Sequence, residues 1–340
     1  MVHAGVLVAA LAAAVPAHGS DGVDAPVGAA WGGMPIAAAV LGLEDPEAAV
    51  ENLPMHITRG GPDTSMYERP IWTILPYVSY EGQARSNLQG DGGSLRVDRF
   101  AAGGNLIVGP EKDLQISIIF NYERSNYRLR GARLAPGGTQ LLSDVDAYDF
   151  IPNFELRLGP DWGVFGGGIL AWAGEDGADF GDSARYGGFG GVRWLISDKL
   201  NFALGLTVIT RLEEDVSVFP IIGIEWEFAE HWRLLTEGPG VKLEYDPTDY
   251  LILRLRVAYN TREYRLDEAN PAMPSGIFRD ASVPITFGAD FVPHPFFSLS
   301  AFVGFTAYQQ LQIDNFDGVR FAHPQVKPGL VFGVSVQLQF

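Results

Sequence analysis

The chain of 340 residues contains no cysteine, which excludes disulfides, free thiols and thiolate chemistry. Positive charge is scarce as well. The 24 Lys and Arg residues stand against 41 Asp and Glu residues, giving a net charge of −17. Because nucleic-acid binding needs a basic patch, this balance argues against a nucleic-acid partner.

Long apolar runs are also missing. Beyond the amino terminus, no run of about 18 or more strongly apolar residues occurs, which argues against a helical membrane protein. The chain has only six His residues, and none has the spacing of metal ligands. No G-x-S-x-G, H-E-x-x-H or phosphate-cradling motif occurs either. We therefore expect no enzyme activity, no metal site and no cofactor.

Two short motifs contain residues that could bind a metal ion or act as a nucleophile. Segment 175–182 concentrates four carboxylates and two glycines, but its spacing does not match a calcium-binding loop, so a solvated acidic loop is the better interpretation. Gly181-Asp182-Ser183 resembles the nucleophile block of a hydrolase family. The Asp-x-x-His pair of that family is missing, and a nucleophile needs its base within hydrogen-bond reach.

The chain is instead rich in alternation from about residue 71 to residue 340. Apolar side chains recur at every second position in run after run, and turns separate the runs. Successive side chains of a strand point to opposite faces, so each run predicts a strand with one apolar and one polar face. No long pattern with the helical period intervenes.

The runs predict an all-β fold of about fourteen strands, or twelve if the short pair around Gly238-Pro239-Gly240 forms only a partial hairpin. The predicted strands are 71–83, 95–108, 114–130, 144–158, 162–173, 184–196, 199–211, 215–228, 231–237, 240–246, 250–265, 282–292, 296–309 and 328–340.

The connections between these strands tend to alternate in length. Short turns such as 159–161 and 197–199 alternate with longer loops such as 131–143, 266–281 and 311–328. Short turns at one rim and long loops at the other are typical of an outer-membrane barrel. The predicted fold is therefore a transmembrane antiparallel up-and-down β-barrel with about 12–14 strands.

The last strand carries the strongest signal. Apolar and small or polar residues alternate without a break from Leu330, and Val336, Leu338 and Phe340 share the apolar face. This strand resembles the carboxy-terminal targeting strand of Gram-negative outer-membrane β-barrels. The resemblance covers about residues 67–340 and is closest to barrel families of unknown function. It implies insertion into the outer membrane by the barrel assembly machinery.

The amino-terminal residues have a different character. Residues 1–18 resemble a secretory signal peptide, with an apolar core at Val6–Val15 and a small-residue cleavage site, although no Lys or Arg precedes the core. Residues 19–66 are rich in Ala, Gly, Pro and acidic residues, which predicts a disordered periplasmic linker. Residues 67–340 then form the barrel, and an even number of strands places both termini in the periplasm.

Aromatic residues recur beside the short turns. An indole or phenol ring prefers the headgroup zone of a bilayer, so these residues predict an aromatic girdle at the periplasmic interface. The alternative is that Trp and Tyr are simply common in strands. The predicted girdle residues are Trp162, Trp194, Trp226, Trp232, Tyr245 and Tyr250.

Charged residues on the polar face of the strands are predicted to line the pore. They would be costly in lipid, whereas in the lumen they can be hydrated and paired. They fit a charged constriction that selects solutes and, equally well, a salt-bridge network that stiffens the wall. Arg254, Arg256 and Arg262 form the most coherent row, because their spacing puts them on one face. The predicted pore-lining residues are Arg254, Arg256, Arg262, Glu225, Glu227, Glu123, Glu155, Arg157, Arg193 and Asp290.

Two functions remain open on the sequence alone. The first is a porin-like, passive channel of the outer membrane for small solutes, with the lipid bilayer and the barrel assembly machinery as partners. The second is a structural or adhesive membrane protein with a plugged lumen and interacting surface loops. Because fold does not fix function, only the contents of the lumen can separate the two.

Overall fold

A computed structural model of the chain describes residues 72–340 except 91–92, 112, 132–141, 143 and 213. The predicted signal peptide and linker, residues 1–66, lie outside the described residues. In the part of the chain that is described, no helix has the length and apolar character needed to cross a membrane.

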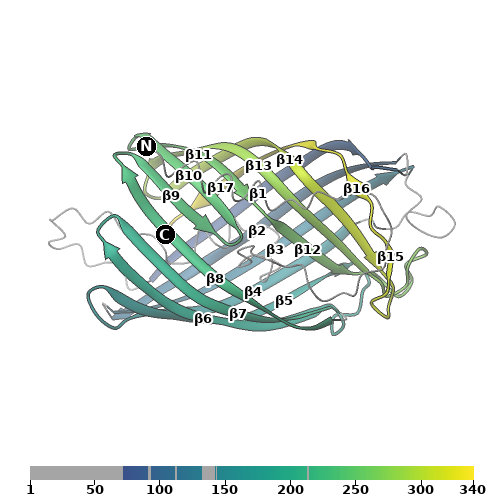
Figure 1. Cartoon of the computed structure of the whole chain (residues 1–340), viewed down its shortest axis with the longest axis horizontal. Coiled ribbons are helices and arrows are strands. Elements are labelled where there is room, and N and C mark those ends of the chain that lie inside the picture. The colour runs from purple at the N-terminus through teal and green to yellow at the C-terminus, as the bar shows by residue number, and fades with distance from the viewer. Residues whose placement is uncertain (1–71, 91–92, 112, 132–141, 143, 213) are drawn as a thin grey trace, which may run out of the picture. The chain divides into compact units, whose positions relative to one another are not determined.

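The regular elements of the described chain are strands (Figure 1). They are β1 (Trp72–Asn87), β2 (Ser94–Glu111), β3 (Leu114–Arg130), β4 (Asp144–Arg157), β5 (Trp162–Glu175), β6 (Ala184–Ser197), β7 (Leu200–Arg211), β8 (Glu214–Ala229), β9 (Trp232–Glu237), β10 (Gly240–Thr248), β11 (Leu251–Ala258), β12 (Asn260–Arg265), β13 (Ile277–His294), β14 (Phe297–Asp314), β15 (Arg320–Ala322), β16 (Gln325–Val326) and β17 (Gly329–Leu338).

The sheet closes on itself. β1 pairs with β2 on one side and with β17 on the other, and Ile74 and Phe340 exchange two backbone hydrogen bonds of 3.0 Å. β11 and β12 pair with β13 in one register and count together as one strand of the barrel, while β15 and β16 are short segments beside β14. The result is a closed antiparallel barrel of 14 strands, which confirms the predicted fold class.

The alternation of the sequence becomes an inside and an outside. On β3, Phe120 is 49% exposed on the outer face, whereas its neighbours Ile119 and Asn121 are buried on the inner face. The same arrangement recurs around the wall: large apolar side chains lie on the outer face, and many charged side chains lie on the inner face. A soluble protein rarely exposes so large a contiguous apolar surface. An outward apolar band of this kind is typical of a barrel whose solvent is lipid.

Outward-facing aromatic residues lie at both ends of this band. The predicted girdle residues lie near the short turns, where Trp162 faces Trp194 and the rings of Trp232 and Tyr245 stack at 4.6 Å. A second set, which includes Trp172, lies towards the loops. Trp162 and Trp172 are ten positions apart on β5. With about 3.3 Å per residue and a strand tilt of about 35–45°, that separation spans roughly 25 Å, the height of an outer-membrane apolar band.

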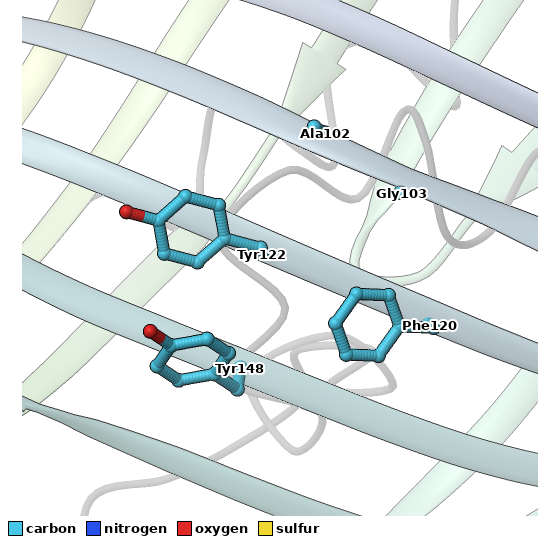
Figure 2. Close-up of a pocket in the computed structure, with 5 residues that line it drawn as sticks. All are labelled: Ala102, Gly103, Phe120, Tyr122 and Tyr148. Atoms are coloured by element: carbon cyan, nitrogen blue, oxygen red, sulfur yellow. The ribbon is translucent and has the colours of Figure 1, made fainter.

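A shallow hollow marks the loop side of the band on the outer face of β2, β3 and β4 (Figure 2). The short side chain of Ala102 leaves space beside the rings of Phe120, Tyr122 and Tyr148. The rings of Tyr122 and Tyr148 are 5.1 Å apart, and the Tyr122 hydroxyl donates to Asp146 at 2.8 Å. The second aromatic set therefore lies where apolar surface gives way to charge.

The strands run further towards the loops than the alternation predicts. β13 begins at Ile277, so the predicted loop 266–281 is shorter and covers residues 266–276. β14 continues to Asp314, beyond its predicted end at residue 309. The two extensions pair with each other, beginning with Ile277 opposite Asp314, and lie beyond the apolar band. Because neither extension has a side that faces lipid, its sequence lacks the alternation of a wall strand.

Two neighbouring residues of β14 offer a matched test of the faces. Ala301 faces outward, whereas Ser300 faces inward between Asp290 and Ser335. We expect Ala301→Arg to destabilise the folded barrel by about 2–4 kcal/mol, because it puts a guanidinium in lipid. Ser300→Arg should cost far less. Urea unfolding in lipid vesicles measures both, and equal losses would mean that the faces are wrongly assigned.

Candidate functional site

The interior of the barrel is crossed at its long-loop end by the hairpin of β12 and β13. The hairpin pairs Asn260 with Ser282 and ends with Arg265 paired to Ile277. At that end, Arg265 also pairs in parallel with Gly174 of β5. Around the wall, β5 is separated from β12 by β6, β7, β8, β9 and β10, so this contact reaches across the interior.

Aromatic side chains of the hairpin pack on the opposite wall. The ring centroids of Tyr264 and Phe278 lie 5.9 and 5.0 Å from that of Tyr127, and all three side chains are fully buried. Tyr127 belongs to β3, which β14, β17, β1 and β2 separate from β13. The hairpin therefore contacts both sides of the barrel and bridges its interior.

An apolar cluster surrounds these three rings. Its members come from β2, β4, β5, β14 and the loop after β12 as well as from the hairpin itself. Protein interiors packed in this way have few voids large enough for water, so the cluster narrows the axial path at its level. The cluster, here called the plug core, consists of Leu88, Leu95, Val97, Tyr127, Leu142, Val145, Ala147, Ala173, Tyr264, Leu266, Ala272, Met273, Phe278, Leu311, Ile313 and Val326.

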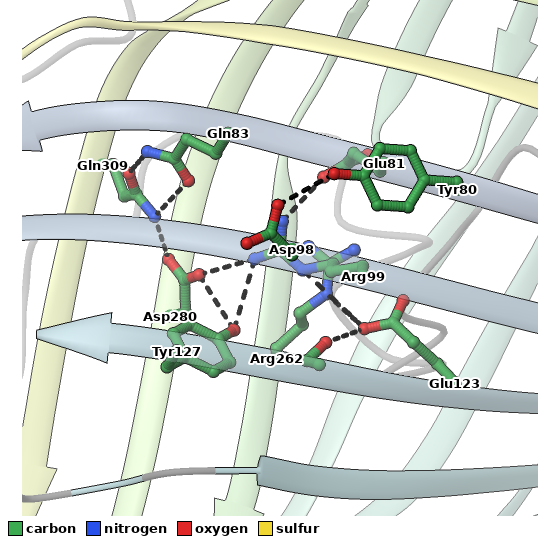
Figure 3. A network of polar contacts seen from close by, with 11 residues as sticks. Tyr80, Glu81, Gln83, Asp98, Arg99, Glu123, Tyr127, Arg262, Asp280 and Gln309 are labelled. Atoms are coloured by element: carbon green, nitrogen blue, oxygen red, sulfur yellow. Dashed lines mark hydrogen bonds and ion pairs between the residues drawn. The ribbon is translucent and has the colours of Figure 1, made fainter.

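A buried ionic network ties the hairpin to the wall (Figure 3). Its centre is Arg99 of β2, whose guanidinium lies 2.6 Å from the Glu81 carboxylate and 3.0 Å from that of Asp280 on β13. The same guanidinium donates to the Tyr127 hydroxyl at 3.2 Å, and Gln309 donates to Asp280 at 2.8 Å. Figure 3 shows these groups converging from β1, β2, β3, β13 and β14.

Glu123, one of the predicted pore residues, joins this network between two guanidinium groups. Its carboxylate lies 3.7 Å from Arg99 and 3.6 Å from Arg262 of β12. All three side chains are buried. Removing one partner from such a group leaves a charge that is buried without compensation, so the network holds both hairpin strands firmly against the wall.

A second cluster fixes the hairpin to the other side of the barrel. Glu263 of β12 accepts hydrogen bonds from Arg279 of β13, from Arg211 at 3.3 Å and from the Leu212 amide at 3.4 Å. Arg185 of β6 lies 3.9 Å from the same carboxylate. One buried carboxylate therefore joins β12 and β13 to β6 and to the end of β7.

The loop of the hairpin is anchored as well. Arg265 donates to the carbonyl oxygens of Ser275 at 2.9 Å and Asp182 at 3.2 Å. Glu175 accepts from the Asn270 amide at 2.7 Å. Part of the acidic segment 175–182, expected to be solvated, therefore binds this loop. In the portion of the chain that is described, no group of His, Cys, Asp and Glu is placed to hold a metal ion.

Below the hairpin, charged side chains of β9, β10 and β11 face the lumen. The Lys242 ammonium contacts the Glu237 carboxylate and lies 2.9 Å from that of Glu244. Arg233 lies 2.7 Å from Glu244, and Arg256 lies 3.4 Å from Glu237. Positive and negative groups alternate across the three strands, so this wall carries both signs of charge.

The predicted arginine row is divided between two places. Arg254 and Arg256 lie on the wall strand β11, where Arg254 is 3.1 Å from Asp290. Arg262 lies on β12 within the hairpin, in contact with Glu123. Their spacing predicts that all three side chains lie on one face, and the continuous register of β11 and β12 with β13 agrees with this. They separate because the chain leaves the wall after Ala258, where the pairing of β10 with β11 ends.

The other predicted pore residues lie nearer the short turns. Glu155 and Arg193 form an ion pair from β4 and β6. Glu225 is buried on β8, and Glu227 lies 3.4 Å from the ammonium of Lys199 near the β6–β7 turn. Arg157 is exposed at the end of β4.

Sequence reasoning missed the residues that hold the hairpin. Arg99, Asp280, Tyr264 and Phe278 were not singled out, and residues 266–281 were expected to form a loop. The one available signal was the run Arg262-Glu263-Tyr264-Arg265, which breaks the alternation at the end of a predicted strand. Charges at successive positions cannot all face a lumen, so such a run indicates a strand that is buried on both faces.

Comparison with known proteins gives structural neighbours only. No protein-family model matches the chain, and no curated protein matches it. Among solved structures, the COG4313 outer membrane channel from Pseudomonas putida F1 is 10% identical, with a TM-score of 0.45, over 83% of this chain and 100% of that one.

Two further neighbours are also outer-membrane proteins of the channel or porin type. The P. putida toluene transporter TodX is 8% identical, with a TM-score of 0.42, over 80% of this chain and 91% of that one. A KdgM porin is 9% identical, with a TM-score of 0.32, over 78% of this chain and 99% of that one. Identities and scores this low assign the chain to no family, so its function must be argued from its own residues.

Proposed function

We propose that this protein is a passive channel of the outer membrane for small solutes. The observation that carries the proposal is a closed barrel of 14 strands with apolar side chains outside and charged ones inside. Side chains nearly fill a barrel of about eight strands, and the diameter grows with strand number, so a wall of 14 strands encloses more space than its own side chains occupy.

In the proposed orientation, the short turns and both ends of the chain lie in the periplasm. The charged outer face of β3 and β4 beyond Tyr122 then lies outside the bilayer. There Arg124 is 3.2 Å from Asp144 and 3.5 Å from Asp146. Hydrogen bonds from Asn126 and Arg124 hold the pKa of Asp144 below its usual range, so this face stays charged at neutral pH.

The carboxy-terminal strand is proposed to direct assembly. Val336, Leu338 and Phe340 would be the residues that the barrel assembly machinery recognises. Phe340 is exposed, although its backbone pairs with Ile74. Recognition of its side chain therefore leaves the closing seam of the barrel intact.

The plug core supports a second candidate, a structural or adhesive protein with a filled lumen. Packing across the whole interior is what such a protein needs, whereas a channel needs a route past it. Swelling of liposomes in small uncharged solutes separates the two. A channel swells the liposomes at a rate that falls with solute size, and a filled barrel gives no swelling although it inserts.

The charged wall below the hairpin predicts a pair of opposite effects on ion selectivity. Arg256→Gln removes a positive charge from the lumen and should shift the reversal potential in a salt gradient towards cation selectivity. Glu237→Gln removes its partner's charge and should shift the potential towards anion selectivity. Lys199→Gln, in an exposed pair at a turn, serves as the control and should cause no shift. Conducting channels with identical reversal potentials would remove this wall from the ion path.

A further inference from the structure

Arginine side chains gather on the outside of the barrel, beyond the loop-side end of the apolar band. Arg96 of β2 and Arg124 and Arg128 of β3 lie on the outer face, and their side chains are about half exposed. Arg85 near the end of β1 and Arg130 at the end of β3 are exposed as well. Five of the 24 basic residues, in a chain with a net charge of −17, therefore lie together on three neighbouring strands. We call them the arginine patch.

The strand register places two of these arginines directly opposite each other. Arg96 pairs with Arg128 in the β2–β3 ladder, and the two share the Asp98 carboxylate at 3.0 and 3.8 Å. Like charges that face each other across a sheet are destabilising, and one carboxylate offsets only part of this repulsion. Among the described residues of β1 to β4, this face adds only Asp144 and Asp146 as further acidic groups, so it keeps a net positive charge.

A row of aromatic side chains lies on the bilayer side of the arginine patch. Tyr122 pairs with Tyr148, and Tyr148 pairs with Trp172, so three outward rings follow one another across the sheet. Ala102 pairs with Tyr122 and takes the next position of the row. Its methyl group is too small to continue the row, and the hollow lined by Ala102, Phe120 and the two tyrosines lies here (Figure 2).

The distances along β3 indicate the size of a headgroup that could reach the arginines. Arg124 and Arg128 lie two and six positions beyond Tyr122. With about 3.3 Å per residue and a strand tilt of about 35–45°, they stand roughly 5 and 15 Å above the tyrosine ring. Aromatic rings of a girdle lie at headgroup level, so a lipid with a single phosphate reaches Arg124 only. A lipid that also reaches the Arg96–Arg128 pair needs a large headgroup with further anionic groups.

We propose that this outer face binds a lipid of the outer leaflet whose large headgroup carries more than one phosphate. An acyl chain of the lipid lies in the hollow beside Ala102, and its phosphates bind Arg124 and the Arg96–Arg128 pair. The planar guanidinium group suits bidentate binding of phosphate, and a phosphate between Arg96 and Arg128 offsets their mutual repulsion. The proposal rests on the proposed orientation of the barrel in the outer membrane and is independent of the channel, because the site lies outside the lumen.

Binding of lipid to the whole barrel, folded in detergent micelles, tests the site by native mass spectrometry. The probe is a rough lipopolysaccharide, which carries phosphates on its lipid anchor and on its sugar core, and the control probe is the same molecule after its phosphates are removed. The test variant combines Arg96→Gln, Arg124→Gln and Arg128→Gln. The control variant lowers the net charge equally at exposed positions elsewhere and combines Lys199→Gln, Arg320→Gln and Lys327→Gln.

A second variant addresses the hollow without changing any charge. Ala102→Phe places a ring where the acyl chain would lie, and Ala301→Phe, on the outer face of β14, is its control. Exposed ion pairs contribute little to stability, so the arginine variant should fold. The heat-dependent electrophoretic mobility of each variant verifies its folding.

We expect the arginine variant to bind the phosphorylated probe about tenfold more weakly than the parent, because charge-assisted hydrogen bonds to phosphate are lost. Its control should bind as the parent does. Removal of the phosphates should weaken binding to the parent and leave binding to the arginine variant unchanged. Ala102→Phe should weaken binding several-fold, and Ala301→Phe should not.

Equal losses in the two charge variants would overturn the proposal, because total charge and not the arginine patch would then govern binding. Parent protein that binds the probe equally well with and without phosphates would overturn it too. Unchanged binding by Ala102→Phe would contradict the place proposed for the acyl chain. A barrel that conducts no ions but binds the probe as expected refutes the channel and leaves the lipid site standing.

Discussion

Shortening the β12–β13 hairpin should raise the ion conductance of the protein several-fold. The variant replaces residues 263–279 with Asn-Gly and so joins Arg262 to Asp280, which are paired in the hairpin. A two-residue Asn-Gly turn suits the twist of antiparallel strands. The change removes Tyr264 and Phe278 from the plug core, together with the loop that crosses the lumen.

The shortened hairpin keeps the ionic network around Arg99 and loses the cluster around Glu263. Arg262 stays beside Glu123, and Asp280 stays beside Arg99. The matched control shortens the exposed turn at 315–319, whose hydrogen bonds join Asn315, Gly318 and Val319 to one another. If the shortened hairpin yields a folded barrel with the conductance of the parent, the hairpin is not the obstruction in the lumen.

Arg99→Ala should lower the stability of the barrel more than removal of any exposed charge. It leaves Glu81, Glu123 and Asp280 close together without the guanidinium that they share. Breaking a buried ionic group by removing one partner costs about 3–5 kcal/mol. Urea unfolding in lipid vesicles measures the loss.

Arg96→Ala is the matched control on the same strand. Arg96 is exposed on the outer face and pairs with Asp98 at 3.0 Å, and exposed pairs of this kind contribute little. A loss for Arg99→Ala no larger than that for Arg96→Ala would mean that the network in Figure 3 does not hold the hairpin.

The sequence predicted the wall well because lipid imposes a simple rule on every wall strand. A side chain that faces lipid must be apolar, whereas one that faces the lumen need not be. The alternation is therefore present even in the short strands near Gly238. The short pair there was predicted either as two strands or as a partial hairpin, and the structure has it as β9 and β10, which are the shortest strands of the wall apart from the β11–β12 segments.

The hairpin could not be predicted in the same way. Its residues face protein on both sides, so Arg262, Glu263 and Arg265 obey no alternation. The contacts that hold it are distant in the chain: Arg99 and Asp280 are 181 positions apart, and Tyr127 and Asp280 are 153 apart. Periodicity records which face a residue takes, but it does not record which distant residue it meets across a lumen.

Single-channel recording of the full barrel in a planar bilayer shows whether this protein is a channel. Insertion is verified in parallel by the heat-dependent electrophoretic mobility of the folded barrel. We expect discrete conductance steps that are small in the parent and several-fold larger when residues 263–279 are replaced. A barrel that is folded and inserted yet silent in both forms would contradict a channel and would establish the filled, structural barrel in its place.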